Sequence, residues 1–254
     1  MGTEAAAGAF SFVVPVYDEA DGIDRTWAIV RRTGEAMAGA GVIGCWEAVF
    51  VDDGSTDGTS GLLDDFAARD ERLRVVHHGA NRGVGAAMRT GLAAAGGDLV
   101  LYTDADLPFD LGLVPALVEE LRDSGSDLLS AVRRGRRGES TTGAVRSWIY
   151  NVLVRLVFHL PVHDVNFACK LATRRALAPA RWHSESPFID VEWLVWAHRT
   201  GCRIVQPGVE YRRRDRGASS MGGLRVVVLM LADLVRFHRR LRRSRGVPII
   251  DAFS

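Results

Sequence analysis

The chain has 254 residues, 47% of them hydrophobic and 25% charged, with a formal net charge of +1. This composition is ordinary for a globular protein with a sizeable core, and the near-neutral charge gives no reason to expect a nucleic-acid partner. The three cysteines, Cys45, Cys169 and Cys202, form no C-x-x-C pair, so we expect buried thiols and no zinc site. The N-terminus lacks the pattern of a signal peptide, and no apolar run is long enough to span a membrane, so a cytoplasmic protein is expected.

In the first half of the chain, apolar runs alternate with segments of helical period. Strands are predicted at 10–16, 46–51, 73–77, 99–102 and 127–131. Helices are predicted between them at 21–40, 59–69, 84–95 and 111–122. This alternation predicts an α/β fold with a Rossmann-like, mostly parallel sheet, right-handed crossovers and helices on its faces.

From residue 133 onward the pattern changes. A basic loop at 133–140 precedes a predicted amphipathic helix at 142–159, with Trp148, Val152, Leu156 and His159 on one face. The elements expected after it are strand 167–172, helix 188–200, strands 202–206 and 209–213, and helix 222–243. We therefore expect one domain over 1–221 and a helical appendage over 222–254.

Two carboxylates, Asp104 and Asp106, follow the apolar run of the predicted strand 99–102. Open α/β sheets bind ligands at the carboxyl ends of their strands. A pair of carboxylates there suits Mg²⁺ or Mn²⁺, hard cations that take oxygen ligands and share them with substrate phosphates. The structural alternative is a turn or a helix cap.

Polar motifs follow two other predicted strands. Pro15-Val16-Tyr17-Asp18-Glu19 comes after the first, where the acids could meet a base and ribose or cap the next helix. Asp52-Asp53-Gly54-Ser55 comes after the second. A turn explains Gly54 and Ser55, whereas Asp53 could accept a hydrogen bond from a nucleobase N–H.

A glycine-containing segment, Asn81-Arg82-Gly83-Val84-Gly85, opens the predicted helix 84–95. Glycines allow a ligand to approach the backbone, and a helix N-terminus favours anions. The segment lacks the G-x-G-x-x-G spacing after a first strand, which disfavours a dinucleotide-dependent oxidoreductase. His77 and His78 point to opposite faces of their strand and are interpreted as structural residues rather than a metal pair.

Taken together, P-V-Y-D-E, D-D-G-S-T-D-G-T, N-R-G-V-G-A-A and D-A-D resemble the inverting family-2 glycosyltransferases of the GT-A fold. Within that family the chain is most similar to the polyprenyl-phosphate (dolichyl-phosphate) hexosyltransferases. The narrower resemblance is carried by five segments: the arginine loop 133–137, Arg146-Ser147-x-x-x-Asn151, residues 164–170, Phe188-x-x-x-Glu192 and residues 214–220.

The resemblance implies transfer of a hexose from a nucleotide sugar, with GDP-mannose favoured and UDP-glucose possible, to a polyprenyl phosphate. It implies Mg²⁺ or Mn²⁺ held by Asp104 and Asp106, and Arg214 on the donor diphosphate. The donor-binding residues it implies are Pro15, Tyr17, Asp18, Glu19, Asp53, Gly54, Asn81, Gly83, Asp104 and Ala105. The catalytic group it implies consists of Asp106, Arg214, Arg133 and Arg146, with Arg133, Arg134 and Arg146 positioning the acceptor phosphate.

The chain departs from the family pattern at three places. Pro108 stands where a glutamine usually follows D-A-D-L, Phe167-Ala168-Cys169-Lys170 stands for S-G-F-R, and Ser220 replaces a lysine. These departures affect the identity of donor and acceptor more than the fold. Two alternatives therefore stay open: transfer to a soluble hydroxyl acceptor (a saccharide or secondary metabolite), and a non-catalytic nucleotide-sugar binding subunit.

A hydroxyl acceptor would require a carboxylate base, for which Asp164 and Glu192 are the candidates, although each fits a structural role as well. The basic helix at 222–243 has two interpretations. It could contact the cytoplasmic face of a membrane peripherally, or it could pack on the core with a solvated basic end.

Overall fold

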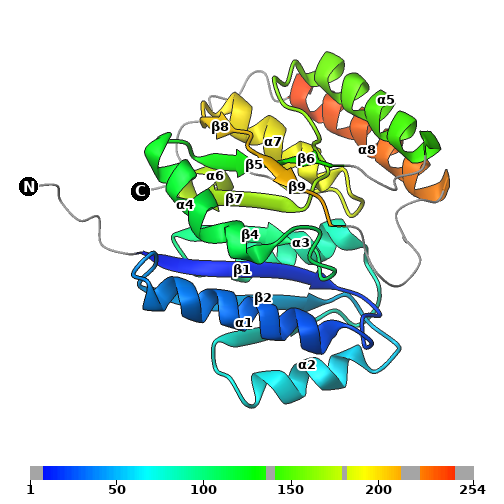
Figure 1. The fold of residues 1–254 in the computed structure, drawn as a ribbon. Helices are drawn as coiled ribbons and strands as arrows, with labels where there is room; N and C mark the ends of the chain where they lie inside the picture. The colour runs from blue at the N-terminus through cyan, green and yellow to red at the C-terminus, as the bar shows by residue number, and fades with distance from the viewer. Residues whose placement is uncertain (1–7, 136–140, 179–181, 213–223, 244–254) are drawn as a thin grey trace, which may run out of the picture.

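The computed structural model describes residues 8–135, 141–178, 182–212 and 224–243 (Figure 1). Within these residues, seven strands form one sheet in the order β3-β2-β1-β4-β7-β5-β8. Their bounds are β1 (Ala9–Val16), β2 (Cys45–Asp52), β3 (Leu73–His77), β4 (Leu99–Thr103), β5 (Leu128–Ser130), β7 (Cys169–Thr173) and β8 (Ile204–Val205). A second, two-stranded sheet pairs β6 (Val132–Arg134) with β9 (Gly208–Glu210).

The longer helices fall close to their predicted positions, whereas the four-residue helix at 174–177 was not predicted. The helices are α1 (Ile23–Gly39), α2 (Thr59–Ala67), α3 (Val84–Ala94), α4 (Val114–Asp123), α5 (Thr141–Phe158), α6 (Arg174–Leu177), α7 (Ile189–Arg199) and α8 (Leu224–Arg243). A 3-10 turn at Leu111–Leu113 precedes α4, because Pro115 at the start of that helix lacks the N–H that would continue the preceding turn.

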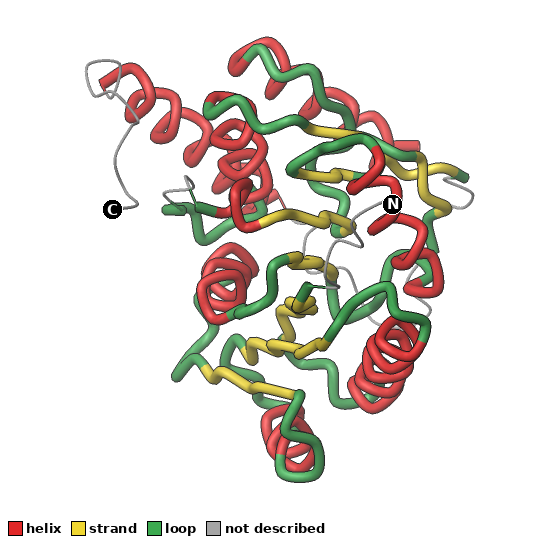
Figure 2. The backbone as a smooth tube through the Cα atoms, turned by 90° about the vertical axis from the view of Figure 1, so that its left-hand side faces the viewer, coloured by secondary structure: helices red, strands yellow, loops and turns green. Residues whose placement is uncertain are grey.

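The sheet is mostly parallel, as predicted, with helices on both faces. Strands β3, β2, β1 and β4 run parallel, and β7 is antiparallel to its neighbours β4 and β5. Strands buried on both faces are expected to be mostly apolar, and β1 is an example, since Phe10, Phe12 and Val14 face one layer and Val13 the other. Figure 2 shows the strands as a central layer between helices.

Each face of the sheet has its own core. Helices α1, α2 and α4 cover one face, where Trp27 packs against Phe50 and Trp46. Helices α3 and α7 cover the other face, and the buried Trp193 of α7 belongs to that core. Helices α5 and α8 lie side by side outside α7, with the rings of Phe158 and Phe237 5.6 Å apart (Figure 1).

Three expectations need correction in the second half of the chain. Arg133 and Arg134 lie on strand β6 and not in a loop, because Arg133 pairs with Val209 of β9. The strands expected at 202–206 and 209–213 are β8 and β9, which join different sheets. The strand expected at 167–172 begins at Cys169.

Helix α5 exists as predicted, but its expected apolar face points to solvent. Trp148 is 64% exposed and Leu156 70% exposed, while Val154 on the opposite side is buried. The helix contacts the core through the face that carries Tyr150, Leu153, Val154, Val157 and Phe158, and it leaves other large apolar side chains outside. Among the helices of the described residues, none is long and apolar enough to cross a bilayer.

Candidate active site

The predicted strand-end motifs converge at one edge of the sheet. Strands β1, β2 and β4 are neighbours and parallel, and Val16 at the end of β1 is in register with Asp52 at the end of β2. Asp104 follows the end of β4 on the same edge, one residue beyond Thr103. The structure thus brings together the residues near 15–19, 52–59 and 104–106, as the sequence predicts.

The carboxylate pair lies just beyond β4. The Tyr102 hydroxyl donates to Oδ1 of Asp104 at 3.0 Å, and Asp104 is partly buried while Asp106 is exposed. Burial, followed by the charges of Asp106 and Asp190, raises the pKa of Asp104 to about 7. A carboxyl group that resists ionisation beside a second carboxylate would be stabilised in its charged form by a bound cation.

The backbone after β4 turns sharply between the pair and Pro108. The Leu107 N–H donates to the Asp104 carbonyl at 3.1 Å, and Leu107 has a φ of 47°. Asp18 and Asp164, both close to the same edge, also have positive φ, at 50° each. Aspartate tolerates this region of backbone space, whereas a leucine there is strained, and such strain clusters at functional sites. The Thr26 hydroxyl holds the turn by donating to the Ala105 carbonyl at 2.6 Å.

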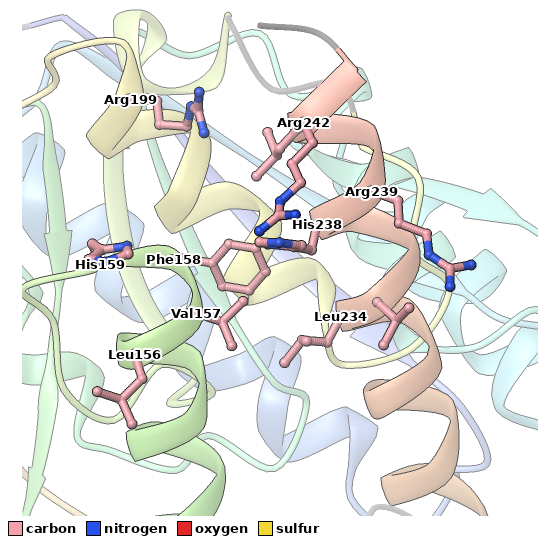
Figure 3. A pocket seen from close by; sticks show the side chains of 11 residues that line it. Leu156, Val157, Phe158, His159, Arg199, Leu234, His238, Arg239 and Arg242 are labelled. Carbon is pink, nitrogen blue, oxygen red and sulfur yellow. The ribbon is translucent and has the colours of Figure 1, made fainter.

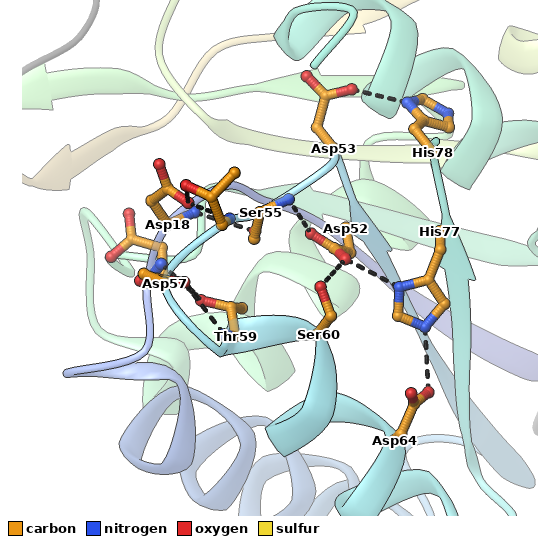
Figure 4. Close-up of polar contacts among 12 residues, drawn as sticks. Asp18, Asp52, Asp53, Ser55, Asp57, Thr59, Ser60, Asp64, His77 and His78 are labelled. Atoms are coloured by element: carbon orange, nitrogen blue, oxygen red, sulfur yellow. Dashed lines mark hydrogen bonds and ion pairs between the residues drawn. The ribbon is translucent and has the colours of Figure 1, made fainter. Parts of the chain in front are cut away.

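The loops after β1 and β2 are joined by hydrogen bonds (Figure 4). The Asp18 N–H donates to the Ser55 hydroxyl at 3.0 Å, and the Thr56 N–H donates to Asp18 Oδ1 at 2.7 Å. The Glu19 N–H donates to the Thr59 hydroxyl at 2.9 Å. Pro15 is buried in β1, and Tyr17 is 39% exposed beside these loops. The two motifs are therefore one rigid unit from which Tyr17 is accessible.

Asp53 is buried and holds the glycine-containing loop. Its Oδ1 accepts from His78 Nδ1 at 2.6 Å (Figure 4). The same oxygen accepts from the Arg82 N–H at 3.0 Å, and Oδ2 accepts from the Gly83 N–H at 2.7 Å. The Gly83 N–H also donates locally to Asn81 Oδ1 at 3.0 Å. The predicted contact of Asp53 with a nucleobase remains a prediction, and the observed role of this carboxylate is to position loop 81–83.

Asp52 and His77 form a second network on the other side of β2. His77 lies between two carboxylates, with Nδ1 2.8 Å from Asp52 and Nε2 3.0 Å from Asp64. Burial opposes the charge on His77, but the two carboxylates outweigh it and raise the pKa of His77. The interpretation of the adjacent histidines as structural residues agrees with this geometry, since His77 and His78 contact different acids.

Arg133 and Asp164 form a nearly buried ion pair beside the same edge. Arg133 Nη2 lies 2.6 Å from Asp164 Oδ1 and Nε 2.9 Å from Oδ2, a bidentate contact. The guanidinium carbon also lies 5.5 Å from the centroid of the Tyr211 ring. Glu192, the other candidate base, is buried in α7 and accepts two backbone N–H bonds and the Ser184 hydroxyl. Its contacts are those of a structural residue.

Sequence reasoning missed a buried ion pair beneath the carboxylates. Lys170 of β7 is fully buried, its Nζ lies 2.7 Å from Asp190 of α7, and it also donates to the Phe167 carbonyl at 2.9 Å. The ammonium lies 5.9 Å from the centroid of the Tyr102 ring, whose hydroxyl contacts Asp104. The sequence did contain a signal for this buried pair, namely a lysine flanked by apolar residues in a predicted strand.

Two predicted residues cannot be placed in this geometry. Arg214 lies outside the described residues, as does the part of the arginine loop that follows Gly135. Arg146 belongs to the first half of α5, but its side chain is also outside the description. Their assigned roles stay predictions.

The residues at the end of β4 fit a divalent cation only in company with a substrate. Among the residues that the structure describes, no three His, Cys, Asp or Glu side chains gather into a metal cage. Asp104 and Asp106 offer oxygen ligands, which Mg²⁺ and Mn²⁺ prefer. Mg²⁺ commonly takes one or two carboxylates and completes its shell with phosphates and water, and the donor set here matches that pattern.

The architecture, a mostly parallel sheet between layers of helices, is that of the GT-A fold. Solved structures with this architecture align over 91% of the chain. They include glucosyl-3-phosphoglycerate synthase from Mycobacterium tuberculosis in complex with UDP (TM-score 0.65, 23% identity, 81% of that chain). Another is a mannosyltransferase from Pyrobaculum calidifontis in complex with GDP-Man and Mn²⁺ (TM-score 0.63, 22% identity, 91% of this chain and 65% of that chain).

Residues 11–179 match the family described as glycosyl transferase family 2, and the chain belongs to that family. Its relatives include glycosyltransferase AglD of Haloferax volcanii, 31% identical over 97% of this chain and 40% of the relative. Dodecaprenyl-phosphate galacturonate synthase of Rhizobium johnstonii is 29% identical over 90% of this chain and 67% of the relative. Undecaprenyl-phosphate 4-deoxy-4-formamido-L-arabinose transferase of Pectobacterium atrosepticum is 31% identical over 87% of this chain and 64% of the relative. The chain thus spans less than half of the first relative and about two thirds of the other two.

Proposed function

We propose that the chain transfers a hexose from a nucleotide sugar to a polyprenyl phosphate in a metal-dependent, inverting reaction. The single observation that carries the proposal is its similarity, over about nine tenths of its length, to relatives named as sugar transferases acting on dodecaprenyl and undecaprenyl phosphate. GDP-mannose is the favoured donor and UDP-glucose the second. Neighbours in fold have been solved with GDP-Man and with UDP-glucose, so fold likeness does not choose between these donors.

The chemistry assigned to the site follows from its residues. Loops 17–20 and 54–59, joined to each other, would hold the nucleoside, and loop 81–83, positioned by Asp53, would lie beside it. A cation held by Asp104 and Asp106 would neutralise the diphosphate as it leaves. An acceptor phosphate is already anionic at neutral pH, so it needs positioning by cations rather than a base.

The arginines assigned to the acceptor stand in different surroundings. Arg133 is paired with Asp164, so part of its charge is already balanced, while Arg134 is exposed at the end of β6. We assign Arg134 to direct contact with the acceptor phosphate and Arg133 to fixing the adjacent strand, with Arg146 as a further cation. The division of the chain into a catalytic domain, 1–221, and an appendage, 222–254, belongs to the same proposal.

A soluble acceptor is the second candidate, and one observation favours it. A structural neighbour has been solved with UDP-glucose and phosphoglyceric acid. In that case Asp164 would have to serve as the base, yet Arg133 already donates to both of its oxygens, from Nη2 to Oδ1 and from Nε to Oδ2. The pairing weighs against this candidate.

The two candidates are separated by one assay. The protein is supplied with labelled GDP-mannose or UDP-glucose, together with either undecaprenyl phosphate or 3-phosphoglycerate, and the products are partitioned between butanol and water. Label in butanol is expected, and Arg134→Gln should lower it about tenfold or more, since a charged contact to phosphate is lost. Label found only in a water-soluble glycoside would overturn the lipid acceptor, and donor binding without turnover would favour a binding subunit.

A further inference from the structure

A groove far from the carboxylate pair lies among the C-terminal ends of three helices (Figure 3). Its volume is about 620 Å³, and it is bounded by the last turns of α5 and α8 and by Arg199 at the end of α7. Helix α7 leads into the start of β8, which runs parallel to β5. The groove therefore lies toward the amino ends of these strands, whereas Asp104 follows the carboxyl end of β4.

The walls of the groove combine apolar and basic side chains. Leu156, Phe158 and Val235 supply apolar surface, and Leu156 and Val235 are 70% and 45% exposed. Arg199 and Arg242 stand at its rim, and Figure 3 shows Arg242 directed toward Phe158 and His238. None of the described residues that line the groove is acidic. The chemistry is that of a site for an amphiphile with an anionic head.

The apolar surface continues from the groove along α8. Val228, Leu231 and Val235 follow one another at intervals of three and four residues, and Arg242 comes seven residues later, so all four lie on one side of the helix. The three apolar side chains are between 41% and 57% exposed. The acid of this helix, Asp233, is engaged elsewhere with Ser186 at 2.6 Å and with Arg236 at 2.8 Å.

A simpler explanation covers only part of this arrangement. Arginines in the last turn of a helix stabilise its dipole without any ligand. That effect does not account for large apolar side chains left in contact with water beside them. Apolar patches rimmed by charge mark interaction sites in soluble proteins, and a basic rim selects an anionic partner.

We propose that the groove between α5, α7 and α8 binds an anionic phospholipid of a membrane surface. The phosphate would lie between Arg199 and Arg242, and an acyl chain would cover Leu156 and Val235. The exposed apolar residues of α8 would then rest in the headgroup region of the bilayer. This inference does not depend on the transferase activity and is tested without it.

The test is co-sedimentation of the full chain with vesicles of phosphatidylcholine alone or mixed with phosphatidylglycerol. Binding is expected only to the mixed vesicles. The double variant Arg199→Gln/Arg242→Gln should bind about thirtyfold more weakly, at about fivefold for each cation removed near the surface. The matched control Arg32→Gln/Arg69→Gln removes two exposed arginines on the α1 and α2 side and should bind like the wild type.

A second variant, Leu156→Ser/Val235→Ser, keeps the charges and removes the apolar walls. It should also weaken binding and should leave the far-ultraviolet circular dichroism unchanged. Equal loss in the arginine control would show a general charge effect and overturn the site. Unchanged vesicle binding of Leu156→Ser/Val235→Ser would also overturn the site, because the basic residues alone would then be sufficient for binding.

Two further outcomes would overturn the lipid as occupant. Titration with inorganic phosphate should show no calorimetric binding at concentrations where dihexanoyl phosphatidylglycerol binds. If phosphate alone binds as well, the groove is a simple anion site. The other outcome is a dimer in sedimentation velocity that Leu156→Ser/Val235→Ser dissociates, together with no binding of the wild type to mixed vesicles. That result would mean that a second copy of the chain covers this surface.

Discussion

Asp53 illustrates at the scale of one residue how the candidate site is held together. Its carboxylate accepts from two backbone N–H groups and one imidazole while almost completely buried. The position of a carboxylate at a strand end is visible in the sequence, because an acid there breaks an apolar run. The partner of that carboxylate is not visible, because loop 81–83 is some thirty residues away.

We predict that Asp53→Asn destabilises the protein by about 1–3 kcal/mol, because the amide NH₂ would face a backbone N–H and leave it unsatisfied. The free energy of unfolding in urea measures this effect. Asp18→Asn, at an exposed site, serves as the control and should cost less. An Asp53→Asn protein as stable as the wild type would show that the carboxylate does not hold the loop.

His77 predicts a pH dependence of stability. Its pKa is raised in the folded protein, so it stabilises the fold fully below its unfolded pKa of about 6.5 and loses that contribution as the pH rises through the folded value. His77→Gln should therefore lower the free energy of unfolding more at pH 5.5 than at pH 8.5. Comparing His77→Gln with the wild type at the same pH cancels the contributions of other groups that titrate in this range, including Asp104. A penalty that grows with pH would contradict the assignment.

At the scale of elements, Gly54 allows the loop after β2 to meet the loop after β3. Its φ is +75°, and a Cβ there would lie 2.6 Å from the Ala80 carbonyl carbon. A turn with glycine is predictable from D-D-G-S, whereas the contact with residues 80–81 depends on the pairing of β2 with β3.

Gly54→Ala should therefore destabilise the protein by about 2 kcal/mol or more, through backbone strain and a clash with main-chain atoms. Gly61→Ala is the matched control, since Gly61 lies in α2 with open space around it. That change should stabilise the protein by about 0.5–1 kcal/mol through helix propensity. Thermal unfolding of both variants shows whether the signs differ as expected.

Strand β6 shows where sequence patterns fail at this scale. Val132-Arg133-Arg134 has no apolar alternation, so the segment is naturally interpreted as a loop. It becomes a strand because β9 supplies its partners and because Arg133 pairs with Asp164 on a distant segment. Neither contact is local, and local propensity carries no information about them.

The ion pair itself can be measured by a double-mutant cycle. Arg133→Gln or Asp164→Asn alone should each destabilise by about 3 kcal/mol, because a nearly buried charge loses its partner. The double variant should cost less than the sum, with a coupling of about 1 kcal/mol or more in the free energies of unfolding. Additive effects would show that the pair contributes little beyond its separate contacts.

At the scale of the whole molecule, the first half of the chain is more predictable than the second. Up to β5, each strand is followed by a helix that packs on the sheet. The hydrophobic periodicity of the segments and their order along the chain are therefore enough to predict this half. Beyond β5 the chain inserts β7 antiparallel between β4 and β5, and it places α5 and α8 outside the main layers. The carboxylate pair was predictable because it follows a strand of the regular half. The Lys170–Asp190 pair was not, because it joins two elements of the irregular half.

The most direct test of the proposed chemistry is transfer of labelled hexose from GDP-mannose or UDP-glucose into butanol-extractable undecaprenyl phosphate, with Mn²⁺, Mg²⁺ or EDTA. We expect label in the organic phase with either cation, none with EDTA, and a loss of about a hundredfold or more in Asp106→Asn, since the charge stabilisation by a cation is worth several kcal/mol. Undiminished transfer in EDTA or by Asp106→Asn would contradict a metal site at the end of β4.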